Sequence, residues 1–213
     1  ARPALRLAAL QRIRVIHEYS HDSFYLGEDG PTHQSIEHVM SMRLIPDFYV
    51  MRPADARETE IMMAEALELQ WPTAICLTRQ KLPLLTLSDQ QLQEARKGAY
   101  VVHPGGDPEF IIFATGSEVS LALEVAQAMG GDCVQVVSVP CWELFENQSD
   151  DYRQKIMCSS IKNRISIEAG STLGWQKYTG VDGLNIGIDH FGASAPADVL
   201  AEKYGFTVQA VQK

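Results

Sequence analysis

Short apolar runs alternate with amphipathic helical segments along most of the chain, and this alternation constrains the fold more than any other feature. Six runs have the length and apolar character of strands, at about residues 12–20, 72–80, 110–114, 134–140, 164–170 and 185–192. Helical patterns cover about 1–10, 52–67, 115–130 and 194–205. Strands that alternate with helices favour a mostly parallel sheet that helices cover on both faces. We therefore predict an α/β fold.

Local signals predict the ends of several of these elements. In the stretch 12–20, alternation puts Ile13, Val15, His17 and Tyr19 on one face of a strand. The first helix would carry Ala4, Leu5, Ala8 and Ala9 on one face. Helix starts are predicted at Asp55 with Glu58, at Thr115 with Glu118 and at Ser194, and helix ends at Gly130 and Gly205.

The order of these elements predicts two units. We expect two three-layer α/β units with mostly parallel sheets, at residues 1–85 and 100–213. A polar linker with a helical turn or two would join them over 86–99. The chain begins without Met, on a segment that already reads as helix. We therefore expect a fragment of a longer protein, in which the first unit is incomplete.

The composition argues against several classes of partner. The formal net charge of -9 disfavours nucleic acid and anionic membrane surfaces, because both bind clustered Lys and Arg. No apolar run is long enough to span a membrane. The cysteines form no C-x-x-C pair, and the N-terminus lacks the pattern of a signal peptide. We expect reduced thiols in a cytoplasmic protein.

Metal and nucleophile chemistry find little support. His17 and His21 are four residues apart, but on a strand this spacing is about 13 Å, too far for one metal ion. No G-x-S-x-G motif is present. The "TGSE" turn, 115–118, could bind an anion at a helix N-terminus, yet a plain strand-to-helix turn explains it better.

The loop "SHDSFYLGEDGPTHQ", 20–34, is the most informative stretch. Its turn residues could fold the chain back so that His21, Asp29 and His33 face one cleft. Arg79 follows a buried strand, at the edge where α/β sheets place ligands, and could grip a phosphate. A solvated loop with a surface arginine explains the same composition equally well. Composition and spacing leave both interpretations open.

Longer motifs decide between them by resemblance. "HDSFYLGEDGPTHQ", "RPADARE" and "PTAICLTRQKLP" resemble, in order and spacing, the later half of the pyrimidine-binding domain of transketolases. "FATGSEVSLALEVA", "VVSVPCWELFENQ", "RISIEAG" and "FGASAPADVLAEKYGFT" are similar to the C-terminal domain of the same family. The resemblance covers nearly the whole chain.

The resemblance implies a function for the parent enzyme. Transketolases transfer a two-carbon ketol unit between sugar phosphates in the pentose phosphate pathway, as cytoplasmic homodimers with thiamine diphosphate and Mg²⁺ (or Ca²⁺). By analogy, His33 would contact the hydroxyls next to the donor carbonyl, and Asp29 would read the configuration of the neighbouring hydroxyl. His21 and Arg79 would hold the phosphate.

The chain also departs from the family pattern. Phe24-Tyr25 replaces an Ile-Gly pair, Ser35 replaces Pro, and Lys81 replaces Asn. No Gly-Asp-Gly metal motif occurs, and the family's activating glutamate and stacking aromatics precede the matching region. We therefore expect no catalytic, cofactor or metal residues in this chain, and no activity from it alone. A dihydroxyacetone synthase-like relative and a non-catalytic interaction module are the alternatives.

Overall fold

Two sheets of different size organise the chain in the computed structural model, which describes residues 2–212. The first sheet has the strand order β1-β3-β2, and the second has the order β4-β6-β5-β7-β8. All pairs are parallel except the antiparallel pair of β4 with β6. The predicted α/β class with mostly parallel sheets is confirmed.

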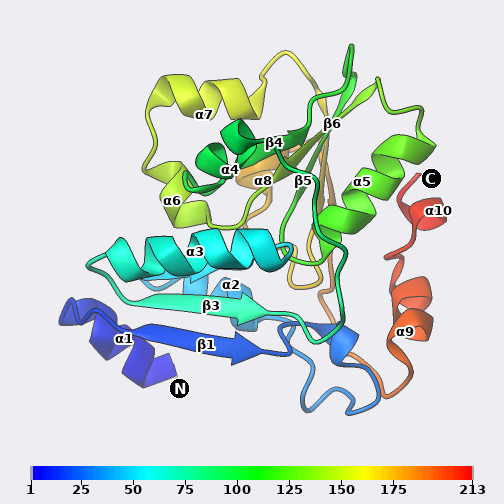
Figure 1. Cartoon of the computed structure of the whole chain (residues 1–213). Coiled ribbons are helices and arrows are strands. Elements are labelled where there is room, and N and C mark those ends of the chain that lie inside the picture. Colours follow the sequence, from blue (N-terminus) through cyan, green and yellow to red (C-terminus); the bar gives the residue numbers. More distant parts are fainter. Residues whose placement is uncertain (1, 213) are drawn as a thin grey trace.

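Figure 1 shows the helices and strands that form and cover the two sheets. The strands are β1 (Ile16–Ser20), β2 (Tyr49–Met51), β3 (Thr73–Leu77), β4 (Tyr100–His103), β5 (Phe110–Ala114), β6 (Val134–Ser138), β7 (Asn163–Ile167) and β8 (Leu184–Ile186). The helices are α1 (Arg2–Leu10), η1 (Phe24–Leu26, a 3-10 turn), α2 (His38–Arg43), α3 (Ala56–Glu68), α4 (Asp89–Ala95), α5 (Glu118–Ala128), α6 (Trp142–Glu146), α7 (Asp150–Met157), α8 (Gln176–Thr179), α9 (Ala197–Tyr204) and α10 (Val208–Val211).

Helices cover both faces of the first sheet because successive side chains of its central strand point to opposite sides. On β3, Ala74 and Cys76 pack in one cluster with Leu5 of α1 and with residues of α2. Ile75, between them, packs in another cluster with Met62 of α3 and with α6 of the second unit. The apolar run of β3 is therefore buried on both sides.

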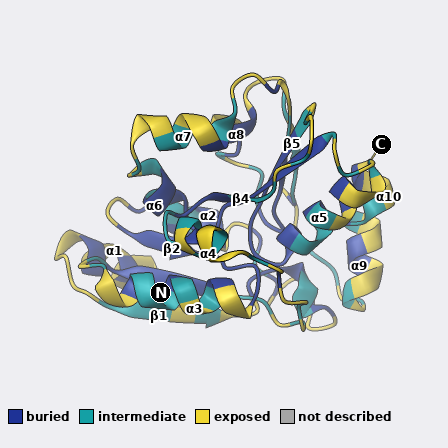
Figure 2. Ribbon diagram, turned by 45° about the horizontal axis from the view of Figure 1, so that its top comes forward, coloured by how far each residue is buried: buried dark blue, intermediate teal, exposed yellow. Residues whose placement is uncertain are grey.

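The second sheet is layered in the same way. On β5, Ile112 and Ala114 face a cluster that includes α5, α9 and α10, whereas Ile111 and Phe113 face one that includes α6, α7 and α8. Figure 2 shows the strands of this sheet as mostly buried, with exposed residues on the outer sides of the helices. No helix within residues 2–212 is both long and apolar enough to cross a membrane.

Some predicted element ends are confirmed. The Asp55 side chain accepts from the Glu58 N–H at 2.8 Å and caps α3. Gly205, with φ +82°, closes α9. β1 begins only at Ile16, because a Schellman turn ends α1: Ile13 N–H bonds to Ala8 O, and Arg12 takes φ +55°. The predicted strand over 12–20 is therefore too long.

Two predicted caps are wrong because their side chains bond elsewhere. The Thr115 hydroxyl donates to Arg52 O, and the Glu118 carboxylate binds Arg52. Ser117 takes the N-cap position of α5 and makes no side-chain cap bond. The Ser194 hydroxyl donates to Glu28 O, and Pro196 takes the N-cap position of α9. Both hydroxyls instead form hydrogen bonds across the interface between the units.

The two units are joined through the end of β2. Met51 forms an isolated antiparallel bridge with Cys141 of the second unit. The Arg52 N–H donates to Pro140 O at 2.8 Å, and Arg52 O accepts from the Gly116 N–H at 3.0 Å. These backbone bonds fix the edge of the first sheet against the turn that precedes α5.

Candidate functional site

A cavity of about 660 Å³ opens at the carboxyl ends of β1 and β3. Its floor comes from the last two residues of β1, the two residues that follow β1, and Cys76 of β3. The loop 31–35 and α2 form one wall, and Arg2 and Leu5 of α1 form another. Phe191, from the second unit, stands at its rim and is 80% exposed. Both units therefore contribute to this cavity.

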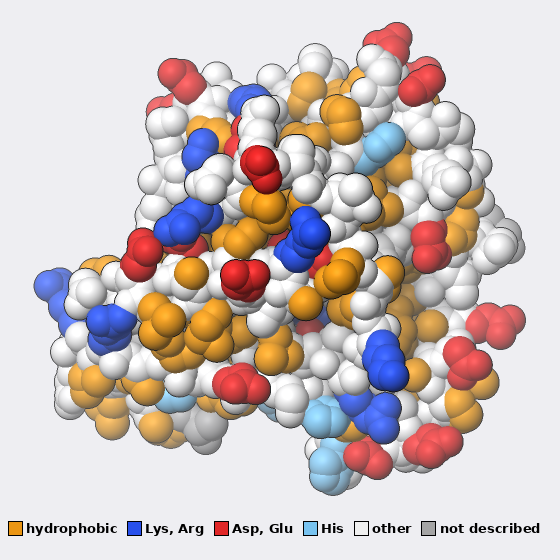
Figure 3. All heavy atoms as spheres, viewed as in Figure 1, with side chains coloured by type: hydrophobic (Ala, Val, Ile, Leu, Met, Phe, Trp, Pro, Cys, Tyr) orange, Lys and Arg blue, Asp and Glu red, His pale blue; other side chains and the backbone are white. Residues whose placement is uncertain are grey.

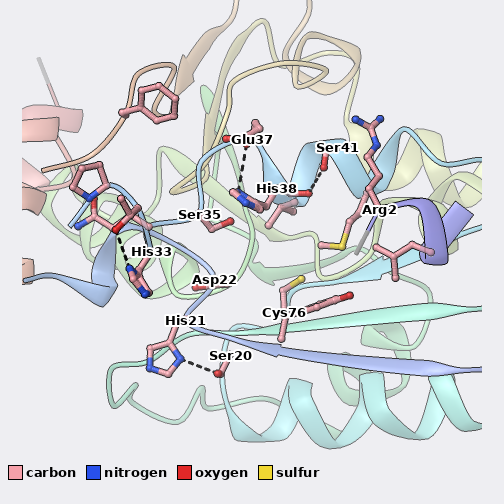
Figure 4. A pocket seen from close by; sticks show the side chains of 18 residues that line it. Arg2, Ser20, His21, Asp22, His33, Ser35, Glu37, His38, Ser41 and Cys76 are labelled. Carbon is pink, nitrogen blue, oxygen red and sulfur yellow. Dashed lines mark hydrogen bonds and ion pairs between the residues drawn. The ribbon is translucent and has the colours of Figure 1, made fainter. Parts of the chain in front are cut away.

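His21 and His33 line the same cavity (Figure 4). In His21, Nδ1 shares a hydrogen bond with Ser20 Oγ at 2.7 Å, and in His33, Nδ1 shares one with Thr32 Oγ1 at 3.0 Å. Each ring is thus oriented through Nδ1, and Nε2 is the atom that can serve a ligand. Both residues are exposed, so a molecule in the cavity could reach them.

The backbone conformation of a few residues determines the path of this loop. His21 itself takes φ +63°, a conformation uncommon for a residue with a Cβ. Gly27 and Gly30 take φ +83° and +78°, and the Gly30 N–H donates to Gly27 O at 3.2 Å. These turns return the chain from β1 to the cavity, so that His33 lies near His21.

Asp29 and Arg79 occupy exposed segments, and neither is among the described residues that line the cavity. Arg79 follows β3 by two residues and His21 follows β1 by one, and Ser20 pairs with Leu77 in the sheet. Arg79 and His21 therefore leave the same sheet edge. Figure 3 shows histidine, basic and acidic side chains adjoining one another at the lower edge of the molecule.

A buried ionic chain runs beneath the loop. Arg52, which follows β2, is fully buried, and its Nε donates to Asp22 Oδ2 at 2.6 Å. Its Nη1 donates to Thr115 O at 2.7 Å and also binds the Glu118 carboxylate. Glu118 Oε2 further accepts from the Ala169 N–H at 2.7 Å. Asp22, the residue next to His21, is thus connected to α5 and to the segment that follows β7 in the second unit.

Burial and neighbouring charges shift the pKa values of these buried ionic groups in opposite directions. Burial alone would lower the pKa of Arg52, but the carboxylates of Asp22 and Glu118 raise it well above its usual value. Burial raises the pKa of the Glu118 carboxyl, although Arg52 opposes that shift. Arg52 therefore stays charged, and the arrangement is stable only while its partners are present.

A second buried ion pair lies across the same interface. Arg43 of α2 binds Glu168 through two bonds, at 2.7 and 2.8 Å, and its guanidinium stacks 4.1 Å from the Trp142 ring centroid. The Trp175 indole N–H donates to Glu168 Oε2 at 2.8 Å. Burial would raise the pKa of Glu168, but Arg43 and Trp175 bring it below 4.5. This pair fixes α2, a wall of the cavity.

Sequence reasoning missed Asp22, Gln34 and Arg52 as site-supporting residues. Asp22 and Gln34 each directly follow one of the cavity histidines, and both are buried, at 5% and 3% exposed. Arg52 opens the "RPADARE" motif directly after an apolar strand. An arginine at the end of a buried strand is a signal of a paired charge, since Arg is almost never fully buried alone.

The described residues offer no ready metal centre. Within residues 2–212, no three His, Cys, Asp or Glu side chains lie close enough together to hold an ion. His17 lies on β1, where burial lowers the pKa of its imidazole, and stacks 6.2 Å from Tyr19. Its place in a strand agrees with the interpretation made from its spacing.

Family profiles match both units. The profile of the transketolase pyrimidine-binding domain matches residues 1–84, and that of the transketolase-like TK C-terminal domain matches residues 98–207, more than half of the chain. The chain belongs to the transketolase family. A transketolase of Staphylococcus aureus (strain MW2) is 47% identical over 211 residues, which are 97% of this chain and 32% of that protein.

Solved transketolase structures share the fold. The transketolase from Leishmania mexicana superposes with a TM-score of 0.93 at 44% identity, over 100% of this chain and 31% of that one. A Pichia stipitis transketolase in complex with sedoheptulose 7-phosphate gives a TM-score of 0.93 at 38% identity, with the same coverage. The chain thus spans about a third of the length of the transketolases it matches.

Proposed function

We propose that this chain is the substrate-binding part of a transketolase, an enzyme that transfers a two-carbon ketol unit between sugar phosphates in the pentose phosphate pathway. The observation that carries the proposal is the placement of His21 and His33 in one cavity at the carboxyl edge of a transketolase-family sheet. A sugar-phosphate complex of a related transketolase supports the substrate class. We also propose a cytoplasmic homodimer.

The cavity residues suit a polyhydroxylated anion. An imidazole Nε2 can donate to or accept from a hydroxyl, and a protonated imidazole attracts a phosphate. His33 would bind the hydroxyls next to the donor carbonyl, and His21 would bind nearer the phosphate. Arg79, at the same sheet edge, would complete the phosphate site, and Asp29 would accept from a sugar hydroxyl. The net charge of -9 makes such local donors necessary for an anionic substrate.

The complete enzyme would use thiamine diphosphate with Mg²⁺ (or Ca²⁺). A metal-held diphosphate needs clustered oxygen ligands, above all carboxylates. The described residues lack such a cluster and so do not fit that group by themselves. The proposed part of this chain in the reaction is to bind and orient the sugar phosphate. We propose residues 1–85 as the partial pyrimidine-binding domain, 86–99 as the linker and 100–213 as the C-terminal domain.

Steady-state kinetics of the complete enzyme test this proposal. The variants His21→Ala and His33→Ala should each lower kcat/KM for a ketose phosphate donor by about 10-fold or more, since each removes a hydrogen bond to the substrate. His103→Ala is the matched control, because His103 lies on β4 of the second unit and its Nε2 bonds to Gly131 O. Full activity of both site variants would overturn the proposal. Strong preference for formaldehyde as acceptor would indicate dihydroxyacetone synthase instead.

A further inference from the structure

His21 and His33, two of the histidines that line the cavity, each precede a buried polar residue whose side chain connects, directly or through Arg52, to the second unit. Asp22 follows His21, and Gln34 follows His33. Asp22 reaches the second unit through Arg52, and Gln34 reaches it directly, by donating to Ala193 O. The loop between the histidines is thus fixed to the second unit at both ends.

Gln34 makes the more direct of these contacts. Its Nε2 donates to Gly27 O at 2.8 Å, which closes the loop on itself, and to Ala193 O at 2.9 Å, which docks the loop on the segment before α9. One amide group therefore uses both of its N–H bonds to set the loop's shape and its position. Ser194 adds a hydroxyl bond to Glu28 O, on the same loop.

Gly192 makes room for this amide. A Cβ at residue 192 would lie 1.6 Å from Gln34 Oε1 and 2.8 Å from its Cδ. The nearest obstacle is the far end of a flexible side chain and not backbone, so alanine here would displace the Gln34 amide before it displaced anything else. The space left by Gly192 is thus matched to the Gln34 side chain.

We propose that the C-terminal unit positions the substrate-binding histidines, with Gln34 as the positioning residue for His33 and Gly192 as the residue that admits it. The Asp22–Arg52–Glu118 chain does the same for His21. This gives the C-terminal unit a part in substrate binding, although Phe191 is its only side chain among the described residues that line the cavity. The inference rests on the proposed function only for the identity of the ligand.

A double-mutant cycle on the 213-residue chain tests the positioning without a ligand. The variants are Gly192→Ala, Gln34→Met and the double variant, with Gly106→Ala as control. Gly106 also has a side-chain end, Asp132 Oδ1, as its nearest neighbour, at 3.1 Å, but lies in the 104–109 turn. The measurements are the NMR signals of the His33 and His21 imidazoles and the exchange rates of the loop amides.

We expect Gly192→Ala and Gln34→Met each to shift the NMR signals of the His33 imidazole. Each variant should also speed hydrogen exchange of the backbone amides of residues 33 and 34 by about 10-fold or more, because these two amides donate to Gly30 O within the loop. The effect of the double variant should be clearly smaller than the sum of the two single effects, because Gly192 acts only through the side chain of residue 34. The control should change neither. Additive effects, or unchanged His33 signals in Gln34→Met, would overturn the inference. If Gly192→Ala fails to fold, Gln34→Met, which keeps the side-chain length, still decides it.

In the complete enzyme, Gly192→Ala should raise KM for the sugar phosphate by about 10-fold and change kcat less, because it displaces a binding loop and not a reacting group. An enzyme that turns over no sugar phosphate would contradict the proposed function, while the imidazole and exchange results would still judge the positioning. Altered His33 signals with an unchanged KM would contradict the link from positioning to substrate binding.

Discussion

Arg52 Nε donates to Asp22 Oδ2 at 2.6 Å, and both side chains are buried. Arg52, which follows β2, therefore fixes Asp22, the residue that follows the cavity histidine His21. The same guanidinium binds Glu118 of α5. One arginine therefore joins the edge of the first sheet, the loop that follows β1 and the second unit. Such a buried charge stabilises the fold only when all its partners are in place.

We expect Arg52→Met to destabilise the chain by about 3–5 kcal/mol, because it leaves the Asp22 and Glu118 carboxylates buried without a cation. Urea unfolding followed by circular dichroism measures this loss. Arg96→Met is the control: Arg96 binds Glu65 and Glu68 with its own side chain 39% exposed, so its loss should cost at most about 1 kcal/mol. Equal losses of unfolding free energy in both variants would show that the buried ionic contacts of Arg52 add no more stability than the exposed contacts of Arg96.

Arg79→Ala in the complete enzyme should raise KM for phosphorylated substrates by about 10-fold or more and barely affect unphosphorylated ones, because a charge-assisted contact to phosphate is lost. Parallel assays with a ketose phosphate and a phosphate-free ketol donor separate the two cases. Arg57→Ala, on the exposed face of α3, controls for the loss of a surface charge. If both donors lose equally, Arg79 does not bind phosphate.

The stability that Glu168 adds should depend on pH. Arg43 holds the pKa of the folded carboxyl below 4.5, so its contribution is fully present above about pH 4.5 and is lost as pH falls through the lower folded value. The unfolding free energies of wild type and Glu168→Gln should therefore differ most near neutral pH and converge in acid. Urea titrations between about pH 7 and 3 check this. Glu124→Gln, at an exposed position of α5, should show no such trend, and a gap that widens in acid would contradict the assignment.

The regular elements were predictable from sequence because local pattern and tertiary environment agree in them. The apolar run of β3 is buried on both faces, as its composition predicts. β2 and β4 were missed, because a strand of three residues and a short antiparallel edge strand carry little periodic signal. The caps at Thr115 and Ser194 failed since their hydroxyls bond across the interface between units, which no local pattern encodes.

The candidate site was likewise predictable where local pattern determines it and not where contacts between the units do. Turn chemistry around Gly27 and Gly30 predicted a loop that brings His21, Asp29 and His33 to one cleft; His21 and His33 line one cavity, and Asp29 is not among its lining residues. The supporting roles of Gln34 and Arg52 could not be predicted from spacing, because their partners in the second unit, Ala193 and Glu118, lie more than 60 residues away. Long-range polar contacts of this kind leave no periodic trace in the sequence.

The cysteines should differ sharply in reactivity. Burial raises the pKa of the Cys76 thiol to about 12 and that of Cys141 well above its usual value, whereas Cys133 and Cys158 are only half buried. Alkylation requires the thiolate, and at pH 8 a thiol with a pKa near 12 has roughly 1,000-fold less thiolate than an ordinary one. Iodoacetamide should therefore label Cys133 and Cys158 first.

Peptide mass spectrometry at successive times measures this order. In concentrated urea, the four thiols should react at similar rates, because burial no longer separates them. Cys76 is the informative residue, since it lines the cavity while its side chain stays 2% exposed. Rapid labelling of Cys76 in the folded chain would mean that α1 and α2 open from the first sheet far more often than the packing of Leu5 and Met42 in the cluster of Cys76 allows.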